Sequence, residues 1–584
     1  MLYFRYYLTL LFKANGFAIN ISPDPELEVW WGTKNGGAEV WCWDRSFPLW
    51  LAERIQVNCL PLLGERTDFS FRRLNKEIAR TTRRYAWTEK GAWVRVHNHP
   101  SPSQLLSGRD QMRRLLQKLL PGRELTPAEL VRSLARTGLE APENILELLL
   151  HELVLEGRIK RVAGVGLDPI GRFYCRRCGE KERIYLEYLQ AAPYPCRVCS
   201  SCWNLGTLSD LVPLYSWRGE TPTVKVGSAP QLLLPEFTYW QQRAVDQVLS
   251  FWQNESARTL LVWAVCGAGK TEVVFPVLKV ALSQGKRVLL TVPRREIVRE
   301  LAERIKQSFP GLDFTILYGG RKEEVPGSLL VVATTHQLLR FAPFFHLVIV
   351  DEADAFPLYG NPMLNAALDK VLLPTGKKIY MTATPDASWR GMADQRKIEV
   401  AKIPLRYHGH LLPLPLLVRC KLPTRKEWFV PGVLSDFILG LQERNRKALI
   451  FLPTVELVEE FGTKLKGYFQ EKNHQLAYLH SRDPQREEKI RKFSSGSLTT
   501  LFTTTLLERG LNFRGLDVMI LYADHQRIFS TETLIQIAGR VGRSAEDPDG
   551  IVYFVADTVS PAMKEARRGI ELMNKEARKM RKFT

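Results

Sequence analysis

From Glu236 onward, short apolar runs alternate with longer stretches of helical periodicity, and this alternation constrains the fold more than any other feature. It is typical of parallel sheets with crossover helices. The runs form two sets, separated by a Pro- and Leu-rich segment at 403–422. We expect strands at Leu260–Ala264, Val288–Val292, Leu329–Ala333, Leu347–Val350 and Ile379–Met381, then at Ala448–Leu452, Gln475–Leu479, Thr500–Thr503, Val518–Leu521 and Ile551–Val555. The pattern predicts an α/β protein with two doubly wound lobes and a cleft between them, which is a usual place for a ligand.

A glycine-rich loop follows the first of these strands, at residues 264–271, and opens a helix. Backbone N–H groups of such a loop wrap phosphates, and the helix N-terminus favours negative charge. Lys270 would reach the β- and γ-phosphates, and the Thr271 hydroxyl would ligate Mg²⁺. The strict pattern has glycine where this chain has Ala264, so the loop alone could also be an ordinary turn. We assign ATP binding to Gly267, Ala268, Gly269, Lys270 and Thr271.

A wholly apolar run at 345–350 leads directly into Asp351 and Glu352, with Asp354 close behind. A strand that ends in two carboxylates can place one on Mg²⁺ and the other beside the attacking water. We give the metal role to Asp351 and the water-activating role to Glu352. Behind an apolar strand and after a phosphate loop, these residues are better explained by ATP hydrolysis than by a solvated turn.

Together with further segments, these motifs resemble superfamily 2 helicases of the DEAD/DEAH type over about residues 236–560, which implies two RecA-like lobes. The resemblance implies that Gln241 reads adenine, that Gly510 contacts the nucleotide, and that Arg540 and the arginine finger Arg543 contact the γ-phosphate. It implies contacts to a nucleic-acid strand at Pro293, Arg294, Thr334, Gln337 and Thr503. It implies coupling of hydrolysis to lobe movement through Asp354, Thr382, Thr384 and Gln536. Because both arginines lie in the second lobe, hydrolysis would require lobe closure.

Five of the nine cysteines lie between Cys175 and Cys202, ahead of the first lobe. Two Cys-x₂-Cys pairs at this separation can supply four thiolates for Zn²⁺, and a closed site of this kind is structural. Cys175 and Cys178 form the first pair, and the second is either Cys196 with Cys199 or Cys199 with Cys202. Such clustering suits an intracellular metal site better than a disulfide framework, so we expect a cytoplasmic protein.

The chain is strongly basic, with 82 Lys and Arg against 62 Asp and Glu, a net charge of +20. This surplus implies attraction to a polyanion, either nucleic acid or an anionic membrane face. No apolar stretch approaches the length of a membrane-spanning helix, so we expect the chain not to span a membrane.

The part of the chain before the cysteines carries no catalytic motif and is rich in tryptophan. Residues 1–20 are apolar and aromatic but lack a signal-peptide cleavage site, which predicts a buried strand or hairpin. A capped helix begins at Thr126, with Pro127 in its first turn. An amphipathic segment at 143–156 and a basic turn at 157–166 follow. This order fits a winged helix that could hold duplex DNA, and equally a helical hairpin with a structural or protein-binding role.

The cysteine cluster directly before the first lobe of a basic chain resembles the late-competence DNA-uptake ATPase family (ComFA-like), over about residues 171–584. The resemblance implies Zn²⁺ ligation by Cys175, Cys178, Cys199 and Cys202, with Cys196 as the alternative fourth ligand. It implies ATP-driven translocation of single-stranded DNA at the inner membrane face. It also implies partnership with a phosphoribosyltransferase-like competence protein and a membrane DNA channel. A homo-oligomer stays open, and residues 1–170 are not explained.

These features divide the chain into seven parts. We expect an N-terminal region at 1–170 with a winged helix at about 120–168, a four-cysteine zinc module at 171–212, a linker at 213–235, a first RecA-like lobe at 236–400, an interlobe linker at 401–425, a second RecA-like lobe at 426–560 and a basic C-terminal helix at 561–584.

Three other functions share features with DNA uptake. A primosomal replication-restart or repair DNA helicase would open duplex DNA. A nucleotide-gated DNA clamp or scaffold would bind DNA without moving along it. An RNA helicase fits less well, because the chain has cysteine pairs and because glutamine occupies position 536, at the start of the segment leading to Arg540.

Overall fold

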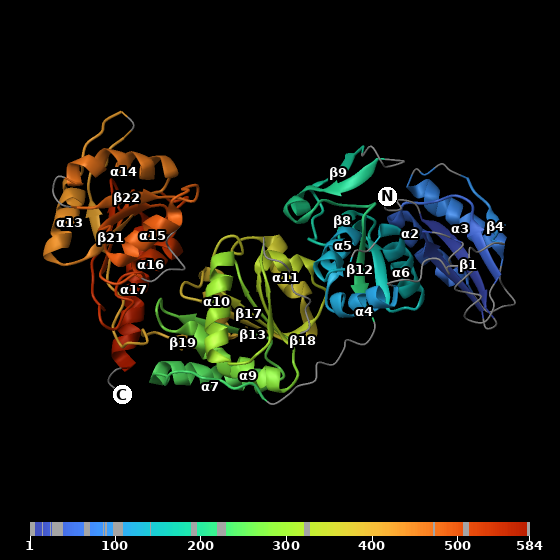
Figure 1. The fold of residues 1–584 in the computed structure, drawn as a ribbon, viewed down its shortest axis with the longest axis horizontal. Helices are drawn as coiled ribbons and strands as arrows, with labels where there is room; N and C mark the ends of the chain where they lie inside the picture. The colour runs from blue at the N-terminus through green and yellow to red at the C-terminus, as the bar shows by residue number, and fades with distance from the viewer. Residues whose placement is uncertain are drawn as a thin grey trace. The chain divides into compact units, whose positions relative to one another are not determined.

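The computed structural model describes residues 6–13, 16–23, 25, 28, 39–63, 70–85, 87, 90–96, 109–139, 142–188, 195–218, 229–319, 328–424, 426–470, 474–505 and 513–580. The chain packs into two compact units. One holds residues 1–225 with segments 313–346 and 361–375, and the other holds 226–312, 347–360 and 376–584. Figure 1 colours the chain from blue at the N-terminus to red at the C-terminus.

The N-terminal part begins with an antiparallel sheet in the order β2-β1-β3-β4. Its strands are β1 (Tyr7–Lys13), β2 (Gly16–Ser22), β3 (Glu39–Trp43) and β4 (Trp93–Arg95). The first two form a hairpin, as the apolar pattern of residues 1–20 predicts. Two helices, α2 (Leu49–Cys59) and α3 (Phe71–Arg84), pack against this sheet, and the short η1 (Leu60–Leu62) follows α2. The core they share includes the buried side chains of Trp43 and Trp50.

The next elements have the order of a winged helix, which confirms the interpretation of this region as α+β. The helices are α4 (Arg109–Leu119), α5 (Pro127–Arg136) and α6 (Glu143–Leu155), and the strands are β5 (Glu124–Leu125), β6 (Ile159–Ala163) and β12 (Pro213–Trp217). The strands form an antiparallel sheet in the order β5-β12-β6. The sequence places the wing at 157–166, but the partner of β6 comes from the segment expected to be a linker. Tyr215 pairs with Arg161 across that distance.

The cysteine module is therefore inserted between the two strands of the wing. It contains β7 (Val165–Leu167), β8 (Phe173–Cys175), β9 (Ile184–Glu187), β10 (Cys196–Cys199), η4 (Ser200–Leu205) and β11 (Leu208–Ser209). At its base, the backbone N–H of Gly164 donates to the carbonyl of Val212 (2.8 Å), so the two ends of the insertion lie side by side.

A buried carboxylate, Glu129 of α5, joins three distant segments of the N-terminal unit. Its side chain completes a capping box with Thr126 at the start of the helix. The same carboxylate accepts from Arg177, between the first two clustered cysteines, at 2.6 Å, and from Arg340 at 2.7 Å. Arg340 also donates to the side-chain oxygen of Gln337 (2.8 Å). Glu129 thus holds the winged helix, the cysteine module and residues 337–340 together.

The first lobe is an α/β unit with a seven-stranded sheet in the order β15-β16-β14-β17-β18-β13-β19. Its strands are β13 (Thr259–Ala264), β14 (Val288–Val292), β15 (Phe314–Leu317), β16 (Leu330–Thr334), β17 (Phe345–Asp351), β18 (Leu372–Thr382) and β19 (Glu399–Ile403). Its helices are α7 (Tyr239–Gln253), α8 (Lys270–Val273), α9 (Phe275–Ser283), α10 (Arg295–Ser308), η5 (Thr335–Arg340), α11 (Pro362–Lys370) and α12 (Ala387–Asp394). Each of the five strands expected from the sequence is present, and the short β15 and β19 were not expected.

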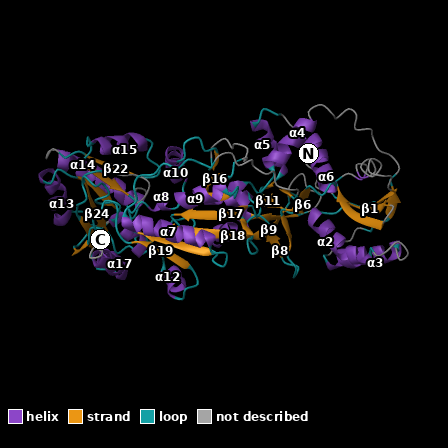
Figure 2. Ribbon diagram, turned by 90° about the horizontal axis from the view of Figure 1, so that it is seen from below, coloured by secondary structure: helices purple, strands orange, loops and turns teal. Residues whose placement is uncertain are grey.

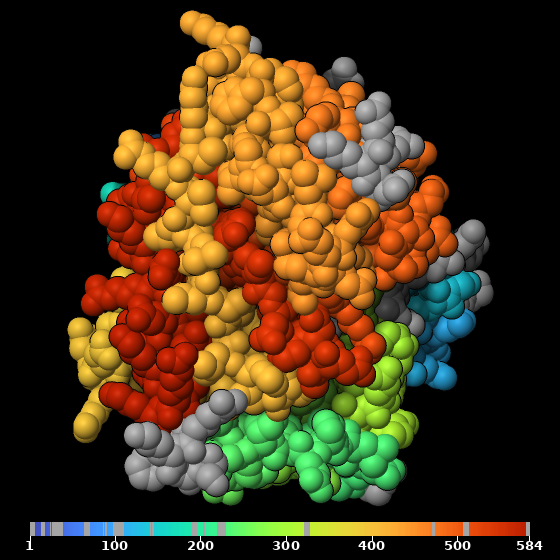
Figure 3. Space-filling view, turned by 90° about the vertical axis from the view of Figure 1, so that its left-hand side faces the viewer, coloured from blue at the N-terminus to red at the C-terminus, as the bar shows by residue number. Residues whose placement is uncertain are grey.

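The second lobe has a six-stranded parallel sheet in the order β20-β25-β24-β21-β23-β22. Its strands are β20 (Leu416–Arg419), β21 (Lys447–Phe451), β22 (Leu476–Leu479), β23 (Thr500–Thr503), β24 (Leu516–Leu521) and β25 (Val552–Ala556). Its helices are α13 (Gly432–Glu443), α14 (Val455–Gln470), α15 (Arg486–Ser495), α16 (Thr531–Ala538) and α17 (Pro561–Met580). Residues of this lobe, orange to red, make up most of the face in Figure 3. The segment expected as an interlobe linker supplies the edge strand β20.

Candidate ATP site and cysteine cluster

The phosphate loop lies between β13 and α8, and two of its glycines adopt left-handed backbone conformations. The φ angles are +80° at Gly267 and +70° at Gly269. Glycine adopts such angles without the steric cost that a side chain brings. A Cβ atom on Gly269 would also lie 2.4 Å from the side-chain nitrogen of Gln241. The loop can therefore close tightly only because this position lacks a side chain.

Gln241 is held against the phosphate loop from the first turn of α7. Its side-chain oxygen accepts from the backbone N–H of Thr238 (2.9 Å), which completes a capping box. Its side-chain nitrogen donates to the carbonyl of Ala268 (3.0 Å). The residue predicted to read adenine thus contacts the loop predicted to hold the phosphates.

Lys270 and Thr271 both contact Asp351 at the end of β17. Lys270 Nζ lies 2.7 Å from Asp351 Oδ1, and Thr271 Oγ1 donates to Oδ2 (3.2 Å). Burial alone would lower the pKa of Lys270, but the charges of Asp351, Glu352 and Asp354 raise it above its ordinary value. The ammonium group is therefore charged, and a hydroxyl and a carboxylate suited to Mg²⁺ lie within hydrogen-bond distance of each other.

Glu352 has a φ angle of +53°, which is a strained conformation for a residue with a side chain. Its backbone N–H donates to Asp351 Oδ1 (2.7 Å). A cavity of about 650 Å³ is lined by the phosphate loop and by Gln241, Asp351, Glu352, Gln536 and Arg543. The structure thus brings most of the predicted nucleotide-binding and catalytic residues to one cavity of nucleotide size, whereas Arg540 is not among the residues that line it.

Four predicted coupling residues also lie together. Asp354 accepts from the hydroxyl of Thr384 (2.6 Å) and from the side-chain nitrogen of Gln536 (3.2 Å). The backbone N–H of Thr384 donates to the Thr382 hydroxyl (3.0 Å). Cys266, in the phosphate loop, donates to the side-chain oxygen of Gln536 (3.2 Å). A residue of the second lobe therefore bonds to both catalytic segments of the first.

Sequence analysis missed one arginine beside this cavity, Arg406. Its side chain is 1% exposed and donates to the carbonyl oxygen of Gly542. The same oxygen lies 3.1 Å from Nε2 of His408. Burial, together with the nearby charge of Arg543, lowers the pKa of Arg406 to about 10. Arg543 donates to the carbonyl of Gly539 (3.0 Å), and Arg540 is 1% exposed. No motif identifies Arg406, because its importance depends on a contact made far along the chain.

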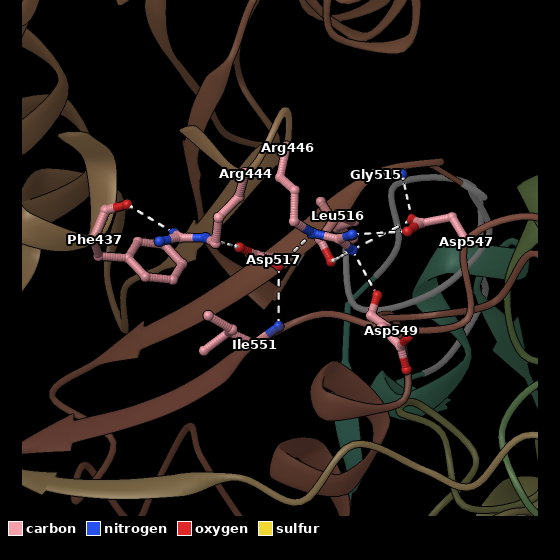
Figure 4. A network of polar contacts seen from close by, with 9 residues as sticks. All are labelled: Phe437, Arg444, Arg446, Gly515, Leu516, Asp517, Asp547, Asp549 and Ile551. Carbon is pink, nitrogen blue, oxygen red and sulfur yellow. Dashed lines mark hydrogen bonds and ion pairs between the residues drawn. The ribbon is translucent and has the colours of Figure 1, made fainter. Parts of the chain in front are cut away.

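The loop that follows Arg543 is fixed by a network of charges around Asp517, drawn in Figure 4. Asp517, in β24, is fully buried and accepts from Arg446 (2.6 Å) and Arg444 (3.2 Å). Arg446 also donates to the Asp547 carboxylate (2.7 Å) and to the carbonyl of Asp549 (2.6 Å). This network therefore fixes the position of the loop that follows the segment carrying Arg540 and Arg543.

The predicted strand-contacting residues lie at strand ends, mostly with buried side chains. Pro293 is buried and Arg294 half-buried after β14. Thr334 and Gln337 are 7% and 6% exposed, and Thr503, at the end of β23, is fully buried. Gln337 is bonded to Arg340, so its side chain positions its own segment. Gly510, predicted to contact nucleotide, lies outside the described residues.

The cysteine module brings together the four thiols that the family resemblance implies. The Sγ atoms of Cys175, Cys178, Cys199 and Cys202 all lie within 4.8 Å of one another, and all four residues are buried. Four sulfurs around zinc at about 2.3 Å are about 3.8 Å apart, so this set fits the ion. Cys196 instead donates to the carbonyl of Glu187 (3.3 Å). The four residues could hold a metal ion, and Cys196 is outside the group.

Comparison with known proteins identifies two family matches and several relatives. Residues 431–545 match the family model of the helicase conserved C-terminal domain, and residues 234–387 match that of the type III restriction enzyme res subunit. The chain is 34% identical to competence protein ComFA of Bacillus subtilis (strain 168), over 77% of this chain and 95% of that protein. It is 33% identical to competence protein ComFA of Streptococcus pneumoniae (strain R6), over 70% of this chain and 91% of that protein.

The solved structures that match include RecG bound to a three-way DNA junction, with 19% identity and a TM-score of 0.41, over 59% of this chain and 47% of RecG. Within the part of the chain that the structure describes, no helix has both the length and the apolar character needed to cross a membrane.

Proposed function

We propose that this chain, which belongs to the ComFA family of competence proteins, uses ATP hydrolysis to move along single-stranded DNA and so to draw transforming DNA inward during natural competence. The family and its helicase domains imply an ATP-hydrolysing protein that acts on nucleic acid. Beyond this, we propose movement of the protein along DNA, a preference for single-stranded DNA and a role in DNA uptake.

The observation that carries the proposal is the bonding of Gln536, in the second lobe, to Asp354 and Cys266 in the first. Asp354 follows the two catalytic carboxylates, and Cys266 belongs to the phosphate loop. Loss of the γ-phosphate of ATP would therefore alter the surroundings of Asp354 and Cys266, the two first-lobe residues to which Gln536 is bonded. This is the connection that converts hydrolysis into lobe movement.

The chain's own residues suffice for the main steps of hydrolysis. Lys270 binds the β- and γ-phosphates, and Gln241 positions the loop that wraps them. Glu352 accepts the proton of the attacking water, and Arg543 places positive charge on the transferring phosphoryl group. Thr271 and Asp351 would hold Mg²⁺, which when bound neutralises phosphate charge. We assign Zn²⁺ to the four buried cysteines, in a structural role.

The remaining parts of the proposal rest on family membership. The chain would work in the cytoplasm at the inner face of the membrane, with a phosphoribosyltransferase-like competence protein and a membrane DNA channel as partners. We propose the domain boundaries expected from sequence with two changes. β12, from the first linker, belongs to the winged helix, and β20, from the interlobe linker, belongs to the second lobe.

The test is the steady-state ATPase rate with single-stranded DNA, duplex DNA or RNA, followed by a single-molecule translocation assay. We expect strong stimulation by single-stranded DNA and stepwise movement. Preference for forked duplex would favour a restart helicase, stimulation by RNA would discard the DNA assignment, and hydrolysis without movement would indicate a clamp.

The control variant is Lys270→Ala. It should abolish hydrolysis and leave single-stranded DNA binding largely intact, because the ammonium group contacts Asp351 and the phosphate loop rather than a strand. Hydrolysis at the wild-type rate would refute the assigned site.

A further inference from the structure

Helix α3 (Phe71–Arg84), in the N-terminal part, carries six Lys and Arg among its fourteen residues and a single acidic residue. All six cations are exposed: Arg72, Arg73, Lys76, Arg80, Arg83 and Arg84. The ATP site does not use this helix, and the strand contacts implied by the helicase resemblance all lie beyond it. In Figure 2 it lies at the surface of the N-terminal part, below the sheet that contains β1.

The two faces of α3 are cleanly separated. Leu74, Ile78 and Thr81 are 1%, 2% and 3% exposed and pack toward the protein. The Thr81 hydroxyl accepts from Asn58 of α2 at 2.9 Å, and the ring of Phe71 lies 5.2 Å from that of Trp41. The apolar side thus fixes the helix to the sheet and leaves the opposite side to solvent.

The cations form a row on that solvent side. At about 100° per residue, Arg72, Lys76 and Arg83 fall within about 40° of one another, along about 16 Å of helix axis. Arg73, Arg80 and Arg84 lie beside them. Arg72 and Lys76, and likewise Lys76 and Arg80, are four residues apart, a spacing at which like charges destabilise a helix. Glu77 pairs with Arg80 at 2.9 Å, at one edge of the row. An anionic ligand bound along this row would relieve the repulsion between its cations.

The geometry points to the phosphate backbone of duplex DNA as that ligand: we infer that the exposed face of α3 is a second DNA-binding site, separate from the ATP-driven lobes. Each strand of a duplex carries one phosphate per about 3.4 Å of helix axis, so a row about 16 Å long spans the axial length of about five phosphates of each strand. Arginine, which supplies five of the six cations, can bind a phosphate through two parallel N–H groups. The inference goes beyond the proposed function and does not depend on it.

Two other polyanions fit less well. Sites for single-stranded DNA usually add aromatic side chains on which bases stack, and no aromatic side chain of α3 is exposed. Helices that lie on membranes insert an apolar face into lipid, whereas the apolar face of α3 is buried in protein. The surface can grip a backbone and cannot read bases, so binding should be independent of sequence.

The experiment compares two double variants of the full chain. Arg72→Gln/Lys76→Gln removes two cations four residues apart on α3. Arg114→Gln/Lys118→Gln removes the same pair of residue types, at the same spacing, from the exposed face of α4. Binding to a short blunt duplex is measured without nucleotide over a range of salt concentrations, alongside single-stranded DNA and vesicles of anionic lipid.

We expect the α3 variant to weaken duplex binding at low salt by about tenfold or more, and to reduce the slope of log K against log salt by about 2. Adding Arg83→Gln should weaken duplex binding further. Arg72→Lys alone keeps the charge and loses the two parallel N–H groups, so it should weaken duplex binding less than the double variant does. Stimulation of the ATPase by single-stranded DNA should keep its kcat and KM. If the wild-type chain showed no such stimulation, the proposed function would fail while the duplex measurement still decided this inference.

Three results would overturn the inference. Equal losses in the α3 and α4 variants would show only a general effect of charge. An equal loss for single-stranded DNA would remove the assignment to duplex. Unchanged duplex binding, with loss of vesicle binding, would assign the surface to a membrane.

Discussion

Two buried carboxylates, each held between two arginines, perform different tasks in this molecule. Asp517 contacts Arg444 and Arg446, which directly precede β21, a neighbouring strand in the same sheet. Glu129 contacts Arg177 and Arg340, which belong to the cysteine module and to η5. Both carboxylates pair with two arginines. The contacts of Asp517 lie within one lobe, whereas those of Glu129 join three segments that are far apart in the sequence.

The difference shows that the same arrangement of charges can either stabilise one lobe or hold separate segments of the chain against one another. Loss of Asp517 removes the buried carboxylate that Arg444 and Arg446 share, so the lobe itself should unfold more easily. Loss of Glu129 removes a connection between η5 and two parts that have separate cores, the winged helix and the cysteine module. Those parts should separate locally while each stays folded.

The largest difference between the Glu129 and Asp517 contacts should appear when zinc binding to the cysteine module is lost. Cys199→Ser should abolish zinc binding and unfold the cysteine module, because structural zinc contributes about 10 kcal/mol or more to small domains. Arg177 would lose its fixed position beside Glu129, whereas the Asp517 lobe should be unaffected. Metal analysis and hydrogen exchange over residues 173–212 measure both effects. The matched control is Cys196→Ser, and equal zinc loss in both variants would refute the ligand assignment.

Next in size is Asp517→Asn, which keeps the side-chain volume and removes the charge. Breaking a buried ion pair from one side costs about 3–5 kcal/mol, so the second lobe should unfold at a clearly lower temperature. ATPase activity should fall as well, because Asp547 and the loop after Arg543 depend on this network. A variant as stable as wild type would mean that Arg446 is held by Asp547 alone.

Glu129→Gln should have a smaller and more local effect. Glutamine can still complete the capping box, so the variant isolates the loss of the two charged contacts. We expect a cost of about 1–3 kcal/mol, seen as faster hydrogen exchange in α5 and η5 and not in the second lobe. Glu124→Gln is the control, since Glu124 pairs with Lys370 in the same unit without contacting η5. Exchange that spreads into both lobes would contradict the local role.

The smallest effect should be the pH dependence of the Glu129 contacts. Burial raises the pKa of this carboxyl, but Arg177, Arg340 and the Thr126 N–H together hold it below its ordinary value. Its stabilising contribution is therefore present above about pH 4.3, the value in unfolded chains, and is lost as the pH falls through the lower folded pKa. The difference in unfolding temperature between wild type and Glu129→Gln should shrink below about pH 4. A difference that grew on acidification would reverse the assigned sign.

The two lobes could be predicted because their strands are short apolar runs placed directly before recognisable polar motifs. Lys270 and Asp351 each follow such a strand, so sequence alone places them at the same sheet edge. The helicase resemblance added Gln536 and Arg543, which no local pattern explains.

Long-range contacts account for what could not be predicted. The second strand of the wing lies beyond the cysteine module, so Pro213–Trp217 carries no local sign of its partner. Arg406 matters because it contacts Gly542, and Gln337 is bonded to Arg340, which itself contacts the distant Glu129. The edge strand β20 has four residues, too few for a clear alternation.

The hydrogen bond between Gly164 and Val212 has a consequence for how this protein could be rebuilt. Since the insertion leaves and re-enters the wing at neighbouring backbone positions, a tight turn could replace it and let β6 and β12 close as an ordinary hairpin. The cysteine module could then be exchanged between relatives as one unit. An exchanged module would have to keep the contacts of Arg177 with Glu129, of Arg176 with Glu53 and of Phe173 with Trp50.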